Sequence, residues 1–220
     1  MRKQPFLGMI AAMDTTGIYL SPLFLPMVGF MVVAAFTPGP NNIMLAASGA
    51  NFGFARTTPH MIGVTAGFSF LLVLAGFGLD QVFRLVPMIQ QVFRIAALGF
   101  ILWLSWKIAT ATPDDEKAKV SQPLKFWQAA SFQLINPKAL VMGVTVISTY
   151  TDPVLAFLPQ FFVLVLSFAV ITHLSVITWA AFGMLISRFI QTPGKFRAFN
   201  ITMAVLLVIS ILPVVGDMFA

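Results

Sequence analysis

Long apolar runs separated by short polar connectors dominate the chain. Six of these runs are long enough to cross a bilayer, which takes about 20 helical residues. We place the six spans at residues 20–48, 61–83, 88–108, 126–150, 154–186 and 199–215. With 59% hydrophobic residues, 9% charged residues and a mean hydropathy of +0.93, the composition leaves no room for a separate soluble domain. The pattern therefore predicts an all-α integral membrane protein.

Two of the apolar runs are interrupted by helix-breaking residues. Thr37-Pro38-Gly39-Pro40-Asn41-Asn42 lies inside the first run, and Asn136-Pro137-Lys138 lies inside the fourth. Proline removes a backbone donor and leaves a carbonyl without its helical partner. At membrane depth such backbone is tolerated only where protein buries it or where it lines a polar cavity. Breaks at matching places in two halves of a chain therefore indicate a transport site near the bilayer midplane.

A polar connector at residues 110–125 divides the chain into two groups of three spans, residues 20–109 and 126–220. Because each group has an odd number of spans, the second group runs upside down relative to the first, which predicts an inverted repeat. Each group opens with its broken helix. Residues 1–19 are interpreted as an uncleaved N-terminal tail, and Met13 is an alternative start to Met1.

The basic residues predict the orientation. One side has only Arg2, Lys3, Arg84 and Arg94, whereas the other has Arg56, Lys107, Lys117, Lys119, Lys125, Arg188, Lys195 and Arg197. The richer side is expected to face the cytoplasm, which places both termini outside. Arg2 and Lys3 count against this orientation unless Met13 is the start. Basic residues in short connectors are typical of membrane proteins, so nucleic-acid binding is not expected.

The breaks also predict a polar binding site. Pro40 and Pro137 suit the first position of a helix, with Gly39 and Asn136 before them as caps. Two half-helices would then point their free N–H groups and positive dipole ends inward. Lys138 adds a full positive charge beside the second one.

Carbonyls complement these donors. The prolines free the carbonyls of Ala34, Phe36 and Gln133, and the three asparagines at the breaks can serve either a donor or an acceptor. A site with donors for a carboxylate and acceptors for an ammonium suits a zwitterionic amino acid. The predicted substrate-binding residues are Pro38, Gly39, Pro40, Asn41, Asn42, Asn136, Pro137 and Lys138.

Alternative interpretations are open for several of these residues. The prolines could merely kink their spans while Lys138 snorkels, but a charge at mid-span costs a few kcal/mol, about 3 on insertion scales, which favours a site. His173 either relays protons or packs as a neutral, hydrogen-bonded side chain. Asp80 is interpreted as an interfacial residue beside Arg84.

No catalytic function is predicted. The sequence has no H-E-x-x-H or G-x-S-x-G motif, and the absence of cysteine excludes thiolate metal sites. We expect no metal, no cofactor and no catalytic residues. A passive channel for small polar solutes is the main alternative to a transporter, because broken helices also line pores. An intramembrane enzyme is a weaker alternative.

Three segments together resemble the LysE/RhtB family of amino-acid exporters: residues 37–42, residues 102–107 (LWLSWK) and residues 136–138. Residues 103–110, with Gly143-Val144-Thr145 and Ser148-Thr149, look closest to the branch that exports cysteine and O-acetylserine. The resemblance implies proton-driven export of small amino acids or their derivatives across a bacterial inner membrane. In that membrane the orientation predicted from the basic residues makes both termini periplasmic, and the absence of an acidic group at the site favours neutral substrates. Homoserine or threonine would satisfy the same physics, and a homo-oligomer is left open.

One departure from the family pattern concerns the proton. Many members carry an acidic residue after the glycines of the second span, whereas this chain has Gly67-Phe68-Ser69. A carboxylate at that place therefore does not carry the proton here, and the coupling is left without an obvious residue.

Overall fold

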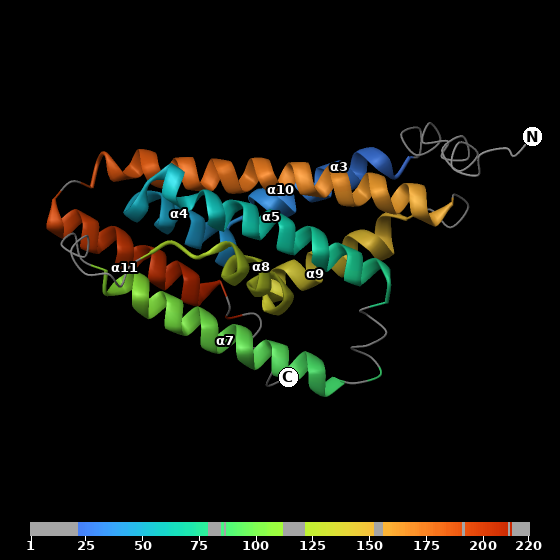
Figure 1. The fold of residues 1–220 in the computed structure, drawn as a ribbon, viewed down its shortest axis with the longest axis horizontal. Coiled ribbons are helices and arrows are strands. Elements are labelled where there is room, and N and C mark those ends of the chain that lie inside the picture. The colour runs from blue at the N-terminus through green and yellow to red at the C-terminus, as the bar shows by residue number, and fades with distance from the viewer. Residues whose placement is uncertain are drawn as a thin grey trace, which may run out of the picture.

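The computed structural model describes residues 22–78, 85, 87–111, 122–151, 156–190, 192–210 and 212. All regular elements in this part of the chain are α-helices, packed side by side in an elongated bundle (Figure 1). They are α3 (Phe24–Phe36), α4 (Pro40–Phe52), α5 (Phe54–Gly76), α7 (Pro87–Ala109), α8 (Phe126–Ile135), α9 (Pro137–Tyr150), α10 (Phe157–Ser187) and α11 (Pro193–Ile209). The predicted all-helical class is confirmed.

Both predicted breaks are present. The axis bends by 51° between α3 and α4 and by 66° between α8 and α9. Pro40 and Pro137 occupy the first helical turn after each break, as expected from their fixed φ and missing donor. Asn136 caps α9, because its side-chain oxygen accepts a hydrogen bond from the Lys138 backbone N–H at 3.2 Å. Gly39 precedes α4 in a fully extended conformation.

Two helix starts differ from the sequence prediction. The second span was expected from Met61, but α5 begins at Phe54 and runs through Pro59. Gly53 allows this, because its positive φ of 78° turns the chain sharply enough to start a new helix directly after α4. The sixth span was expected from Phe199, but α11 begins at Pro193, where the Thr192 side chain caps the helix.

The described residues support a smaller number of spans than the predicted six. Two single helices, α5 and α10, are long and apolar enough to cross a membrane. Counting each bent pair, α3 with α4 and α8 with α9, as one span brings the number to four. α7 contributes a shorter apolar stretch, Leu98–Ala109. The predicted ends of the second and sixth spans, at residues 79–83 and 213–215, lie outside the described residues.

Helices from the two halves of the chain interleave. α4 packs closely against α10, α5 against α8, and α7 against α11. Glycines make the first two contacts close, because a Cβ atom at any of them would overlap the facing backbone. Gly49 faces Ala180 and Gly183 faces Ala46, whereas Gly63 and Gly67 face Phe126 and Ala130. These glycines belong to the small-residue motifs typical of membrane helix contacts.

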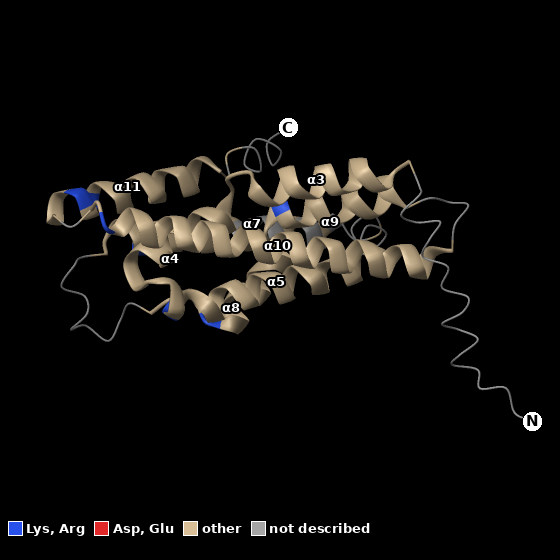
Figure 2. Cartoon of the chain, turned by 90° about the horizontal axis from the view of Figure 1, so that it is seen from above, with Lys and Arg blue, Asp and Glu red and all other residues tan. Residues whose placement is uncertain are grey.

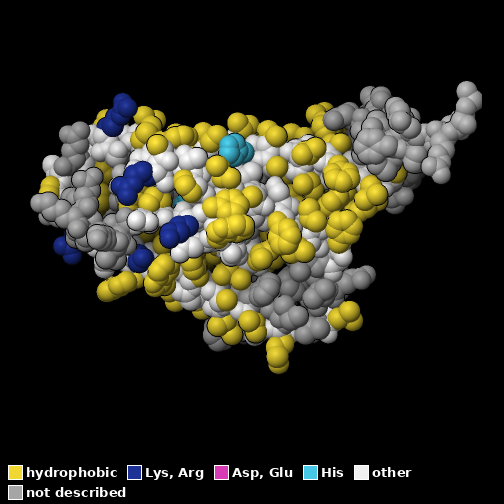
Figure 3. Space-filling model, viewed as in Figure 1, with side chains coloured by type: hydrophobic (Ala, Val, Ile, Leu, Met, Phe, Trp, Pro, Cys, Tyr) yellow, Lys and Arg dark blue, Asp and Glu magenta, His cyan; other side chains and the backbone are white. Residues whose placement is uncertain are grey.

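Charge is concentrated at one end of the bundle. Figure 2 shows most of the basic residues where α8 and α11 begin and one more at mid-bundle near α3 and α9, and Figure 3 shows apolar side chains over much of the remaining surface in view. The helix bounds place the larger group at that end: Arg56, Lys107, Lys125, Arg188, Lys195 and Arg197. All seven Asp and Glu residues of the sequence fall outside the described residues. The described helices therefore contain no carboxylate side chain.

The close contact between α4 and α10 leads to a stability prediction. We expect Gly183→Ala to destabilise the protein by about 1–3 kcal/mol, because the added methyl group would force two backbones apart. Gly29→Ala is the matched control, since Gly29 is a helical glycine with nothing within 4 Å of its Cβ position. The control should be neutral or stabilising by about 0.5–1 kcal/mol. Thermal unfolding in detergent measures both, and equal effects would contradict the prediction.

Candidate substrate-binding cavity

A cavity of about 50 Å³ lies between the two breaks. Its walls come from α3, α4, α5, α8, α9 and α10, so both halves of the chain contribute. The volume is a few times the roughly 10–15 Å³ that one water needs, which suits a small solute. Five of the eight predicted binding residues line it: Gly39, Asn41, Asn42, Asn136 and Lys138. Pro38, Pro40 and Pro137 are not among the lining residues and instead set the breaks.

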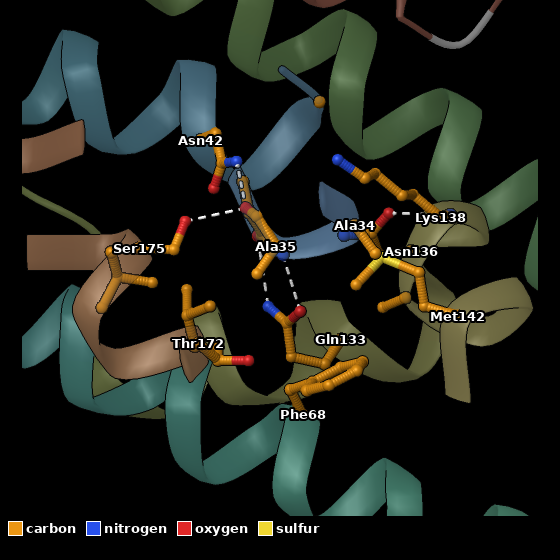
Figure 4. A pocket seen from close by; sticks show the side chains of 15 residues that line it. Ala34, Ala35, Asn42, Phe68, Gln133, Asn136, Lys138, Met142, Thr172 and Ser175 are labelled. Atoms are coloured by element: carbon orange, nitrogen blue, oxygen red, sulfur yellow. Dashed lines mark hydrogen bonds between the residues drawn. The ribbon is translucent and has the colours of Figure 1, made fainter. Parts of the chain in front are cut away.

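Lys138 connects the two breaks. It follows the second break in the chain, yet its Nζ donates a hydrogen bond of 2.5 Å to the Thr37 carbonyl at the first break. Gly39 makes room for this side chain, because a Cβ at residue 39 would lie only 2.7 Å from Lys138 Cδ. The lysine is half-buried and reaches into the bundle (Figure 4). It does not snorkel to the basic end.

Side chains donate hydrogen bonds to two of the carbonyls at the first break, those of Ala35 and Thr37. Asn42 Nδ2 donates to the Ala35 carbonyl at 2.8 Å and to the Thr37 carbonyl at 3.0 Å. Ser175 Oγ, from α10, donates to the same Ala35 carbonyl at 2.7 Å. The sequence pointed to the acceptors that the prolines themselves free. The Ala35 carbonyl was not among those acceptors. In a continuous helix the Gly39 N–H would donate to it, but Gly39 is extended here.

A pair of side-chain amides forms another wall of the cavity. Asn41 Nδ2 donates to Gln133 Oε1 at 2.6 Å, and Gln133 Nε2 donates back to Asn41 Oδ1 at 3.1 Å. Gln133 is completely buried and also donates to the Ala129 carbonyl at 2.9 Å. The pair therefore joins α4 to α8 across the cavity wall (Figure 4). The sequence analysis named Asn41 but missed Gln133, whose partner lies 92 positions away.

Three further lining residues were not predicted as part of the site. Thr172 and Ser175 lie one helical turn apart on α10, and Phe68 lies on α5. The spacing of the two hydroxyl residues places them on one helix face. That spacing was visible in the sequence, but which face of α10 meets the cavity depends on tertiary packing.

His173 lies next to Thr172 in the chain but does not line the cavity. Its Nδ1 is 3.1 Å from the Thr65 hydroxyl of α5, which also donates to the Met61 carbonyl. The proton-relay role stays a prediction. His60 was overlooked because the second span was expected to begin after it. It is buried inside α5, and neither ring nitrogen has a hydrogen-bond partner among the described residues.

The cavity combines one cation with polar groups and an apolar wall. The described lining residues include Lys138 but no Asp or Glu. The described part of the chain has no cluster of three or more His, Cys, Asp or Glu side chains that could hold a metal ion. A carboxylate fits beside Lys138, and hydrogen-bonding groups fit beside the amides and hydroxyls.

Apolar broken helices around a polar cavity are typical of membrane transport proteins. The profile of LysE type translocators matches residues 32–211, and the chain belongs to this family. Its relatives include the cysteine/O-acetylserine efflux proteins of Escherichia coli K12 and Shigella flexneri. Each is 31% identical over 179 residues, covering 81% of this chain and 90% of the relative. No solved structure matches the chain significantly. The family resemblance drawn from the sequence motifs is confirmed.

The amide pair leads to a second stability prediction. Asn41→Leu leaves Gln133 buried with its Oε1 unpaired, so we expect a loss of about 1–3 kcal/mol. Gln133→Met should cost a similar amount. The double variant should lose clearly less than the sum of the two, because removing both polar partners leaves nothing unsatisfied. A double-mutant cycle of thermal unfolding in detergent tests this, and strict additivity would contradict the pairing.

Proposed function

We propose that the protein is a secondary transporter that exports a small neutral amino acid or derivative across the bacterial inner membrane. Cysteine and O-acetylserine are the leading substrates, and homoserine or threonine fit the same site. The observation that carries the proposal is the cavity at the two breaks, where Lys138 enters between helices that contain no described carboxylate. The printed names of the relatives agree with this substrate class.

The chemical groups of the cavity favour binding of a zwitterionic substrate. Lys138 Nζ attracts the substrate carboxylate, and it lies beside the N-terminus of α9, whose dipole has the same sign. The Thr37 carbonyl and the amide oxygens at the breaks accept from the substrate ammonium. With no acidic group to pair with a second cation, lysine and arginine should be poor substrates. Pro38, Pro40 and Pro137 contribute by opening the backbone rather than by contact.

We also propose six spans arranged as two inverted three-helix repeats. The bends of 51° and 66° at corresponding places in the two halves support this arrangement. The basic end would face the cytoplasm, in keeping with the distribution of Lys and Arg, and both termini would be periplasmic. The inward-directed proton gradient would supply the driving force, with proton entry coupled to substrate export and His173 as a candidate relay.

The main alternative is a passive channel for small polar solutes, and an intramembrane enzyme is weaker. Counterflow separates a carrier from a channel. Only a carrier accumulates labelled substrate transiently against its gradient when unlabelled substrate is present on the other side. We expect reconstituted protein to show counterflow of labelled serine or cysteine, and simple equilibration without overshoot would instead indicate a channel.

The double variant Pro137→Ala with Lys138→Ala tests the site. We expect it to lose transport while remaining folded, because the repaired helix hides its N–H groups and the charge for the carboxylate is gone. Losing two charge-assisted hydrogen bonds costs about 3 kcal/mol or more, a factor above roughly 100 in affinity. Uptake of labelled substrate into everted vesicles measures the effect at matched protein levels.

Lys195→Ala is the control for that experiment, since it deletes an exposed lysine at the basic end and should keep transport near the wild-type level. Near-normal transport by the double variant would reduce the Asn136-Pro137-Lys138 motif to a structural kink. Selective uptake of lysine or arginine by the wild-type protein would contradict the electrostatic argument itself.

Orientation is tested with single cysteines, because the native chain has none. We expect Ser121→Cys, in the connector at residues 110–125, to be protected from an impermeant thiol reagent in intact cells. The matched variant Leu85→Cys lies in the opposite connector, where the side chain is 81% exposed, and should be labelled. The reverse result would invert the proposed topology.

A further inference from the structure

Thr172 has a buried hydroxyl without a hydrogen-bond partner among the described residues. The side chain is only 8% exposed. A buried hydroxyl without a partner is unfavourable in a folded protein, and each such group calls for a specific explanation. Thr172 also lines the cavity at the two breaks. The unpaired group and the cavity are two separate observations about the same residue.

A threonine in a helix has an easy way to avoid this cost. Its hydroxyl can turn back and donate to the carbonyl four residues earlier, in one of its two favoured rotamers. Eight other threonines in the described residues do so: Thr37, Thr57, Thr58, Thr65, Thr110, Thr151, Thr178 and Thr202. Thr172 makes no such bond. Its hydroxyl is turned away from its own helix.

The side chain lines the cavity on the side of Gln133 and Phe68 (Figure 4). Figure 4 shows Thr172 reaching from α10 toward the space in front of Gln133 and Phe68, while Lys138 enters from the other side. The neighbouring polar groups are already engaged. Gln133 pairs with Asn41, and Ser175 donates to Ala35. Among the described lining residues, Thr172 is the one with a fully buried side-chain polar atom that has no hydrogen-bond partner.

We infer that Thr172 determines specificity by binding a hydrogen-bonding group on the side chain of the transported amino acid. The inference rests on the proposed function and adds a substrate feature to it. With the carboxylate held at Lys138, the substrate side chain extends toward Thr172. A hydroxyl, thiol or ester group there completes the hydrogen bond that the protein leaves open. An aliphatic side chain of the same size would bury the Thr172 hydroxyl without a partner.

Serine and 2-aminobutyrate are the discriminating pair, because a methyl group in the second replaces the hydroxyl of the first. In reconstituted vesicles, counterflow of labelled serine is inhibited by either unlabelled compound, and the ratio of the two inhibition constants is the readout. We expect the wild-type protein to prefer serine by on the order of tenfold, the usual effect of one hydrogen bond to a buried partner.

Two variants of Thr172 identify the source of that preference. Thr172→Val keeps the shape and removes the hydroxyl, so the ratio should fall to about one, chiefly through tighter binding of 2-aminobutyrate. Thr172→Ser keeps the hydroxyl and should retain a preference for serine. Thr178→Val is the matched control: the same substitution on the same helix, at a residue whose hydroxyl bonds to Leu174 and is exposed. It should leave the ratio unchanged.

The outcomes separate this inference from the proposed function. An unchanged ratio in Thr172→Val, with active counterflow, would overturn the role of Thr172 and leave the transporter proposal standing. Absence of counterflow by the wild-type protein with every small amino acid would overturn both. If Thr172→Val were poorly folded, the wild-type protein and Thr172→Ser would be compared instead. The readout is then how much more serine raises the unfolding temperature of each protein than 2-aminobutyrate does. Equal stabilisation by the two compounds would then contradict the inference.

Discussion

Every carbonyl released by a break in a membrane helix has to find a donor inside the protein, because hydrocarbon supplies none. This constraint explains three of the polar residues around the cavity. The Ala35 and Thr37 carbonyls accept from Asn42, Ser175 and Lys138, which come from α4, α10 and α9. The first break is therefore held by helices from both halves of the chain. The cavity exists because the backbone is open, and it keeps its shape because the open backbone is bonded on several sides.

The local features of this arrangement could be predicted from the sequence. Proline fixes φ and lacks a backbone donor wherever it occurs. Pro40 and Pro137 therefore predicted both breaks and the helical turns that begin after them. Asn136 was recognisable as a cap because its short side chain can accept a hydrogen bond from a backbone N–H of the first helical turn. The glycines at the contacts of α4, α5 and α10 are also local features, since small residues at helical spacing allow backbones to approach, but their facing partners are known only from the structure.

The tertiary features could not be predicted. The partner of Asn41 is Gln133, and nothing in the local pattern of either residue selects the other. Thr172 looked like one of many polar residues in a membrane helix until the face of α10 that meets the cavity was known. The start of α5 was misplaced: the helix begins directly after the turn at Gly53 and continues through Pro59, whereas the expected span began after both residues. That error also concealed His60, a buried residue in the described part of α5.

The Thr37 carbonyl accepts from two donors, Lys138 Nζ and Asn42 Nδ2. If the Lys138 ammonium moves to another acceptor, the hydrogen bond from Asn42 remains, and the Thr37 carbonyl still has a donor. The movement then breaks one charge-assisted hydrogen bond, which contributes roughly 1.5–3 kcal/mol. A new hydrogen bond from the ammonium to another acceptor offsets this loss. Because two donors bond the same backbone oxygen, Lys138, the one basic residue among the described lining residues, can exchange its hydrogen-bond partner without loosening the helices around it.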